Sequence, residues 1–335
     1  MRIIFRWMKG KLLVRGILGV VLAYYVVAFV VLLNAYLFPA KGESIVFVPI
    51  IVSVFLLFPI YVWYRNYRKK AGLSKETTVG NKGTVFLWVF TLFVLALSVR
   101  IPSVLLFGEP YEKTPLILLT ILTILVVEKT EVSAFGFTTR KFAKSLVYGL
   151  LFFLLLDVLA LALFYLLTYI FTNQMLFQSF DPVSFLLVMP FMTLCVGISE
   201  EGLFRGYMQT QLEKIYTAKK AIIFQAVLFG VWHFVWNLSP FNPSAMAQYV
   251  MTTFFIGLFL GYFYSKTRNL TAVVFAHGLW DSFACGIIEN TAAENTLQTT
   301  PVLLINQVLM IVLPYAITAL LTLLFIKYFV KFDDA

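Results

Sequence analysis

Long apolar stretches alternate with short polar ones along almost the whole chain. A membrane core about 30 Å thick needs about 20 apolar residues in a helix, because the helix satisfies its own backbone hydrogen bonds. On that ruler the pattern predicts ten spans: 16–37, 45–64, 85–107, 115–127, 146–171, 183–204, 221–239, 246–265, 270–288 and 302–326. The expected fold class is therefore all-α, a polytopic membrane protein of about ten transmembrane helices.

The fourth of these spans is the shortest. Its apolar run extends only from Pro115 to Val127, which is also typical of a re-entrant or interfacial segment. Loss of this span would reverse the direction of every later one.

Composition agrees with a membrane protein. Of the 335 residues, 61% are hydrophobic and only 13% are charged, which excludes a disordered, collagen-like or disulfide-built secreted chain. Cys195 and Cys285 both lie in apolar segments, where a thiol behaves as a small hydrophobic group.

The positive charges predict the orientation. With ten spans and both termini inside, the inside segments hold 23 of the 26 Lys and Arg residues, as short cytoplasmic loops do. Those segments are 1–15, 65–84, 128–145, 205–220, 266–269 and 327–335, whereas Lys41 and Lys113 fall in outside loops and Arg100 lies inside a span. The basic start is followed by too long an apolar run for a cleaved signal peptide, so we expect an anchor. The aromatic residues lie in the spans rather than between basic residues, so we expect the lipid bilayer and no nucleic acid as a partner.

Ionisable side chains inside the membrane are costly, and they usually have a partner or a function. Glu201 and Arg205 are separated by four residues, so they share one helix face and can pair. Glu200 points about 100° away, and its own helix offers it no counter-charge. A carboxyl without a counter-charge in apolar surroundings holds its proton more tightly, the property of a general base that works near neutral pH. The alternative is that both glutamates are solvated at the membrane interface.

The two histidines of the chain, His233 and His277, both lie well inside predicted spans. Phe229 precedes His233 by one helical turn, and Asp281 follows His277 by one turn. Two histidines and a glutamate on three spans favour a functional cluster over separate structural hydrogen bonds.

Other polar and aromatic residues in the spans carry weaker expectations. We expect Asn237 at the outer interface, and Trp232, Trp236 and Trp280 in an aromatic belt or a substrate groove. Arg100 and Asp157 have no assigned role beyond pairing with another helix.

These residues resemble the motifs of the CAAX-processing and bacteriocin-processing (CPBP, or Abi) intramembrane protease family, which includes the type II CAAX prenyl endopeptidases. The family pattern reads E-E-x-x-x-R, then F-x-x-x-H, then H-x-x-x-N or D. Here these motifs are Glu200, Glu201 and Arg205; Phe229 and His233; and His277 and Asp281. The stretch F-G-F-T-T-R-K before the fifth span also resembles the usual start of the family domain.

The resemblance implies an endopeptidase that cleaves a membrane-associated or lipidated peptide or protein. By this resemblance Glu200 activates water with help from His233, and His277 and Asp281 stabilise the oxyanion. The family's CAAX enzymes usually have Asn where this chain has Asp281, which donates a hydrogen bond only when it is protonated. A bacterial plasma membrane, with the site open to the cytoplasm, is the expected location.

A zinc site built from Glu200, His233 and His277 is the alternative to this metal-free mechanism. The chain lacks H-E-x-x-H, and a metal would compete with Arg205 for a carboxylate, so we favour the mechanism without a cofactor.

The non-enzymatic alternative is a transporter or a bacteriocin-immunity protein that uses the buried Glu and His residues for protons or a partner. The chain shows no repeated halves of the kind common in transporters. We expect an N-terminal extension of four spans over residues 1–127, a six-span protease domain over 128–330 and a cytoplasmic tail over 331–335.

Overall fold

The computed structural model describes residues 42–69, 71–77, 81–107, 112–173, 179–288 and 301–332, without the side chains of 42–53, 107, 172, 179, 288 and 301–311. The predicted span 16–37 and the loop residue Lys41 lie outside this part of the chain. The regular secondary structure of the described residues is helical apart from one short antiparallel ladder between β1 (Ser179–Phe180) and β2 (Ile287–Ile288). The all-α prediction is confirmed.

Helices cover each of the other nine predicted spans. They are α2 (Gly42–Arg68), α3 (Lys82–Phe107), α4 (Lys113–Leu122), α5 (Phe142–Phe153), α6 (Leu159–Thr172), α7 (Pro182–Phe191), α8 (Ile198–Glu201), α9 (Thr210–Glu213), α10 (Ala218–Trp232), α11 (Pro243–Thr267), α12 (Leu270–Gly286) and α13 (Pro301–Tyr328). π-helical segments extend or join several of them at Thr123–Val127, Leu154–Val158, Met192–Gly197 and Gly202–Gln209, and 3₁₀ turns cover Val132–Phe135 and His233–Asn237.

In the described part of the chain, five helical stretches are long and apolar enough to cross a membrane. They are Lys82–Leu106, Phe142–Phe171, Pro182–Glu213, Ala218–Asn237 and Pro243–Thr267. The predicted fourth span corresponds to a shorter apolar helix, Lys113–Val127. These stretches support an integral membrane protein, while the number of ten spans and the orientation of the termini stay predictions.

Local sequence signals begin and end the helices of the site. Asp181 caps α7 by accepting a hydrogen bond from the backbone N–H of Val183 (2.9 Å), and Pro182 occupies the first helical position. Asn242 and Pro243 start α11 in the same way, and α11 stops at Arg268 with a φ of 48°. The helices therefore have defined ends on both sides of the bundle.

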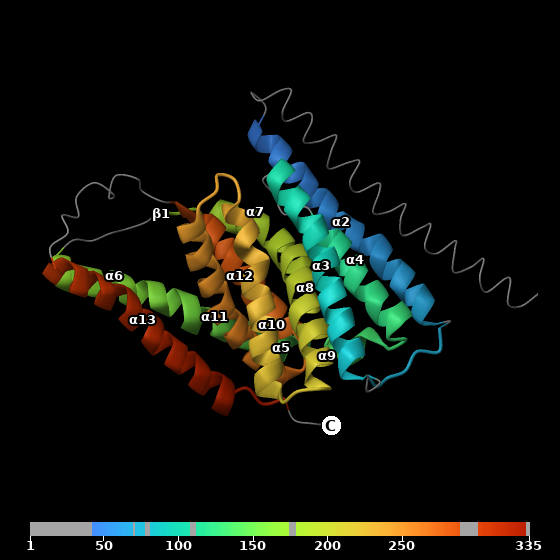
Figure 1. Ribbon diagram of the computed structural model, residues 1–335. Helices are drawn as coiled ribbons and strands as arrows, with labels where there is room; N and C mark the ends of the chain where they lie inside the picture. Colours follow the sequence, from blue (N-terminus) through green and yellow to red (C-terminus); the bar gives the residue numbers. More distant parts are fainter. Residues whose placement is uncertain are drawn as a thin grey trace, which may run out of the picture.

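Five of the predicted inside segments lie together at one end of the bundle, the lower edge in Figure 1. Ser74 bridges to Thr130, Arg68 pairs with Glu131 (3.1 Å), and Lys214 pairs with Glu128 (3.7 Å). Two further contacts complete the group: Arg268 Nη1 to Glu213 Oε2 (2.5 Å), and Lys141 Nζ over the ring of Phe332 (5.6 Å to the centroid). We call this side, formed by the described residues 65–69, 71–77, 81–84, 128–145, 205–220, 266–269 and 327–332, the basic end.

The position of these segments resolves the concern about the short fourth span. The chain enters α3 from the basic end at Lys82 and returns to it after the segment that ends at Val127. The direction of the later helices is therefore the same whether or not α4 crosses the whole membrane.

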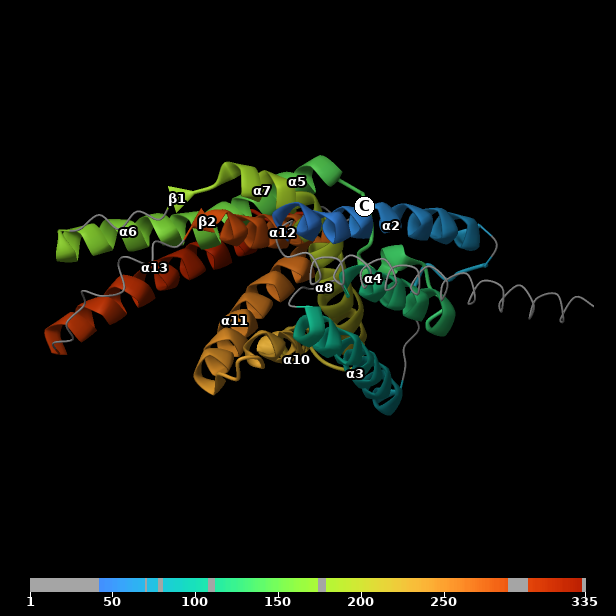
Figure 2. The same cartoon turned by 90° about the horizontal axis from the view of Figure 1, so that it is seen from above.

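The short helix α8 lies near the centre of the bundle, where Figure 2 shows it between α4 and α12. Close backbone packing fixes α12 beside it. A Cβ on Gly278 would lie 2.5 Å from the Cα of Thr193, so only glycine allows α12 to approach this closely. This approach places His277, the residue before Gly278, against the α8 helix. The pair α6 and α13 extends away from the rest of the bundle (Figures 1 and 2).

Candidate active site

The helix that carries both glutamates is longer than the sequence pattern indicates. The predicted sixth span ends at residue 204, whereas the helical stretch continues from Pro182 to Glu213. Residues 205–213 include five polar or charged side chains, yet most of the segment is buried against neighbouring helices, so hydropathy alone does not predict that the helix continues. Glu200 therefore lies thirteen residues before the end of this helical stretch at Glu213, roughly 20 Å at 1.5 Å per residue, and this depth suits its histidine partners.

Glu201 is a fully buried orienting group. Its Oε1 accepts a hydrogen bond from Arg205 Nη1 (3.0 Å) and lies 2.6 Å from His277 Nδ1. The Arg205 guanidinium also lies over the ring of Phe229, with Cζ 4.1 Å from the ring centroid. The predicted Glu201–Arg205 pair is present. Glu201 also binds Nδ1, at the edge of the His277 ring.

Glu200 is buried too, but it is not the unpaired carboxylate that its helix suggests. Its Oε1 accepts hydrogen bonds from the Lys113 ammonium and from Trp232 Nε1 (2.9 Å). Arg100 Nη1 lies 3.6 Å from the same oxygen. The prediction that Glu200 lacks a counter-charge is wrong, because α3 and α4 supply the cations that its own helix cannot.

Glu112 balances these cations. Its Oε1 lies 2.7 Å from Arg100 Nη1 and 3.2 Å from Lys113 Nζ, and all four charged side chains are at most 3% exposed. We call Arg100, Glu112, Lys113 and Glu200 the buried charge cluster. Burying such charges is tolerable only when each has partners, as each does here.

Sequence reasoning missed three members of this cluster. Lys113 was expected in an outside loop, but it starts α4 inside the protein, since Glu112 and Glu200 bind it. Arg100 had no assigned partner. The sequence did contain one signal. Glu112 and Lys113 stand directly before the short apolar run 115–127, and Arg100 lies inside the preceding span.

The second oxygen of Glu200 faces the histidines. Oε2 lies 3.7 Å from His233 Nε2 and 3.8 Å from His277 Nε2, and it has no hydrogen bond to any described group. His233 Nδ1 lies 2.7 Å from the carbonyl oxygen of Phe229, so Nδ1 carries the hydrogen and Nε2 presents its lone pair in the neutral ring. The structure thus brings Glu200, His233 and His277 to one point.

The remaining candidates divide between the site and its surroundings. Asp281 Oδ2 lies 3.3 Å from His277 Nε2, and its side chain is 31% exposed. Trp232 is fully buried and binds Glu200, so it is not a belt residue. Asp157 lies in the π-helical segment Leu154–Val158, and among the described residues no ion pair reaches it, contrary to the expected packing pair.

The mechanism without a cofactor stays a prediction, and the charges around Glu200 favour it over the zinc alternative. Within the described ranges no group of three or more His, Cys, Asp or Glu side chains is arranged to hold a metal ion. The other oxygen of Glu200, the proposed ligand, already binds Lys113 and lies near Arg100, whose positive charges oppose a divalent cation.

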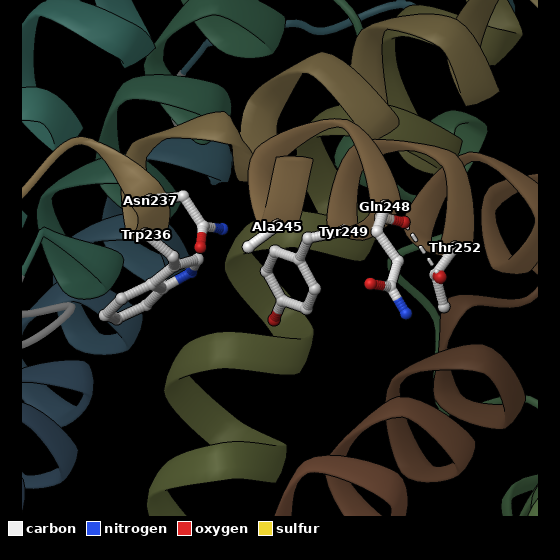
Figure 3. Close-up of a pocket in the computed structure, with 6 residues that line it drawn as sticks. All are labelled: Trp236, Asn237, Ala245, Gln248, Tyr249 and Thr252. Atoms are coloured by element: carbon white, nitrogen blue, oxygen red, sulfur yellow. Dashed lines mark hydrogen bonds between the residues drawn. The ribbon is translucent and has the colours of Figure 1, made fainter. Parts of the chain in front are cut away.

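A pocket of about 390 Å³ adjoins this site. Figure 3 shows its lining, with Trp236 and Asn237 on one side and four residues of α11 (Ala245, Gln248, Tyr249 and Thr252) on the other. The ring of Tyr249 meets that of His233 edge to face, 5.6 Å between centroids. The pocket flanks the 238–242 connection, at the opposite end from the basic end. The expected opening on the basic, cytoplasmic side is therefore not where this pocket lies.

Residues 182–283 match a family model described as type II CAAX prenyl endopeptidase Rce1-like. The match runs from the first residue of α7 into α12 and contains Glu200, His233 and His277. It confirms the family resemblance seen in the three motifs and supports a membrane peptidase at the level of the family. Arg100, Glu112 and Lys113 lie outside it. Searches of curated proteins and of solved structures found no match to the chain.

Proposed function

We propose that this protein is an intramembrane endopeptidase in which Glu200 activates a water molecule for attack on a peptide bond. The observation that supports this proposal is the free oxygen of Glu200, buried and shared between two histidine Nε2 atoms at 3.7 and 3.8 Å. Both distances are longer than a direct hydrogen bond, so the contact can run through a water molecule beside these three atoms.

In the first step Glu200 Oε2 takes a proton from that water. His233 Nε2, with its lone pair toward the site, accepts the water's other hydrogen bond and directs the oxygen at the scissile carbonyl. The new C–O bond forms as the carbonyl π pair moves onto oxygen. A positioned general base of this kind contributes about 10²- to 10⁴-fold to the rate.

The oxyanion is stabilised by His277. Glu201 Oε1 lies 2.6 Å from Nδ1 and Asp281 Oδ2 lies 3.3 Å from Nε2 of this histidine, so both nitrogens carry a hydrogen, and the oxyanion that forms shares the Nε2–H with Asp281. Because Asp281 Oδ2 lies 3.3 Å from His277 Nε2, we assign Asp281 to holding His277 rather than to donating to the oxyanion. The tetrahedral intermediate collapses when Glu200 passes its proton to the leaving amine nitrogen and the C–N bond breaks.

The buried charge cluster prepares Glu200 for this work. Lys113 and Trp232 bind Oε1, so the carboxylate has one fixed orientation and Oε2 is the oxygen presented to the water. The domain boundary expected after residue 127 would place Lys113 and Glu200 in different domains, although the two side chains are bound to each other. We therefore propose that the N-terminal extension is part of the active site rather than an independent unit.

The substrate class follows from the location of the site. Pro182–Glu213 and its neighbours are apolar helices, so a peptide that reaches Glu200 must be associated with the membrane. The family description names prenylated substrates, but Asp281 in place of Asn favours a membrane peptide without a requirement for a prenyl group. We place the enzyme in a bacterial plasma membrane, in line with the resemblance to bacteriocin-processing proteins.

The experiment compares peptides released from membranes that contain the wild type or Glu200→Gln at equal expression. The amide keeps the size of the side chain but cannot take a proton, so peptides produced by the wild type should be absent from the variant. Identical peptide sets would refute the peptidase and leave a proton-relay or partner-binding role for the cluster.

A further inference from the structure

We infer that the peptide substrate reaches Glu200 from the end of the bundle opposite the basic end, through the pocket between residues 233–237 and α11. This inference rests on the proposed function and adds the direction of access and the class of peptide.

The pocket adjoins the site through two aromatic side chains. Tyr249, which lines it, contacts the ring of His233. Trp236, on the other wall, lies over Arg100 of the buried charge cluster, with 5.4 Å from Cζ to the ring centroid. A peptide in this pocket is therefore one aromatic layer away from both the histidine and the cluster that binds Glu200.

Helix lengths place the pocket close to one end of the bundle. Tyr249 is six residues after the start of α11 at Pro243, about 9 Å, and eighteen residues before its end at Thr267, about 27 Å. His233 is fifteen residues after the start of α10 at Ala218, and Asn237 ends the same helical stretch. The way in from the pocket is thus much shorter than any way in from the basic end.

The charge distribution decides which side of the membrane this is. The basic end gathers the Lys- and Arg-rich segments, and such segments stay in the cytoplasm. The pocket consequently opens toward the non-cytoplasmic side. A peptide tail in the cytoplasm would have to pass the packed residues 200–213, which are almost all buried.

The lining of the pocket suits a peptide main chain. Its six residues are uncharged: two aromatic, one small and three with amide or hydroxyl groups. The amides of Asn237 and Gln248 offer donors and acceptors, and the Thr252 hydroxyl donates to the carbonyl of Gln248 (3.0 Å), so its oxygen is available as an acceptor. The volume of about 390 Å³ falls in the range of about 300–1,000 Å³ typical of ligand pockets.

A second cavity provides the contrast. It measures about 360 Å³, lies at the basic end, and is lined by Arg140, Lys266 and Arg268 among others. Neither cavity is lined by Glu200, His233 or His277, but Tyr249 and Trp236 connect the first pocket to His233 and Arg100. The cationic cavity is thus remote from the chemistry, and the neutral pocket adjoins it. We therefore assign as substrate a neutral, extended peptide segment at the non-cytoplasmic face of the membrane.

Two matched serine-to-cysteine variants test the direction of access without any substrate. Ser244 lies beside the pocket and Ser133 at the basic end, and both are exposed. Each is changed to Cys in a Cys285→Ala background, because Cys285 is the exposed native thiol and Cys195 is buried. In intact cells a membrane-impermeant maleimide should label Ser244→Cys at once and Ser133→Cys only after permeabilisation. Labelling of Ser133→Cys in intact cells, or protection of Ser244→Cys until permeabilisation, would overturn the inference.

Kinetics test the pocket itself, on a peptide found with the Glu200→Gln comparison. Gln248→Leu with Thr252→Val should raise KM about tenfold or more while kcat stays within about threefold, since both groups bind substrate and neither reacts. Lys266→Leu, in the cationic cavity, is the control and should leave both constants unchanged. An unchanged KM in the pocket variant refutes access by this route, whereas failure of the peptidase itself would appear as activity retained in Glu200→Gln.

Discussion

Residues 182–283 and residues 82–128 both reach Glu200, but they do so with different kinds of sequence. The first segment matches the family model and carries the motif residues, whose partners are mostly one helical turn away. The second has no motif, yet it supplies Arg100, Glu112 and Lys113 to the same oxygen or its partners.

The difference is instructive because the two oxygens of Glu200 divide between the segments. Oε1 is bound by Lys113 from α4 and Trp232 from α10, and Oε2 faces His233 and His277. A motif search finds His233 and His277, which face the reacting oxygen Oε2. It misses Lys113, which binds Oε1 and helps to orient the carboxylate. The N-terminal segment therefore deserves the same experimental treatment as the motifs.

Among variants that test the contribution of residues 82–128 against that of residues 182–283, Lys113→Met should have the largest effect on stability and activity. Removing one partner of a buried charge network typically costs about 3–5 kcal/mol, because the other charges stay buried. We expect a clear fall in the thermal unfolding temperature in proteoliposomes and a large loss of peptidase activity. Lys75→Met, at an exposed lysine, is the control, and Lys113→Arg should restore most of both properties. Equal behaviour of Lys113→Met and Lys75→Met would remove α4 from the site.

The next effect should come from His277→Gln. Loss of one oxyanion donor usually lowers kcat by about 10²- to 10³-fold. KM should change little, because His277 binds the transition state rather than the substrate. Steady-state kinetics check this, with Trp280→Phe, whose indole ring centroid lies 6.4 Å from that of His277, as the neighbouring control. A loss confined to KM would place His277 in substrate binding instead.

A smaller effect is expected for Glu201→Gln. Groups that orient another side chain commonly cost about 10- to 100-fold in activity when they are altered. Here the change weakens the contact to His277 Nδ1 and the pair with Arg205. The measurement is kcat beside that of Glu200→Gln, and a deeper loss in Glu201→Gln would exchange the roles of the two glutamates.

Asp281→Asn should have the smallest effect. The amide can still bind His277 and can also donate to the oxyanion, so we expect kcat to stay within about threefold or to rise. Cleavage of a prenylated test peptide should be compared between wild type and variant. A hundredfold loss of kcat would show that the carboxylate itself takes part in the reaction.

Much of the fold follows from hydropathy alone. The predicted spans from 45–64 to 302–326 all coincide with helices, and the Lys and Arg counts group five segments that the structure places at one end. The polar continuation 205–213 was not visible in this pattern, since its residues are buried by neighbouring helices rather than by lipid.

The site was predictable to the extent that its residues are close in sequence. Spacing of four residues identifies the pairs Glu201–Arg205 and His277–Asp281, and both are present. Contacts such as Lys113–Glu200, 87 residues apart, depend on how helices are arranged around α8. Helical spacing carries no information about that arrangement, so the sequence alone did not predict that Lys113 and Arg100 supply the counter-charge of Glu200.

The most direct test of the account is the single-turnover cleavage rate of purified Glu200→Gln in proteoliposomes, measured beside its thermal unfolding. Water activation by this carboxylate predicts a rate about 10²- to 10⁴-fold below the wild type with the fold intact. A folded Glu200→Gln protein that cleaves at the wild-type rate would contradict the account.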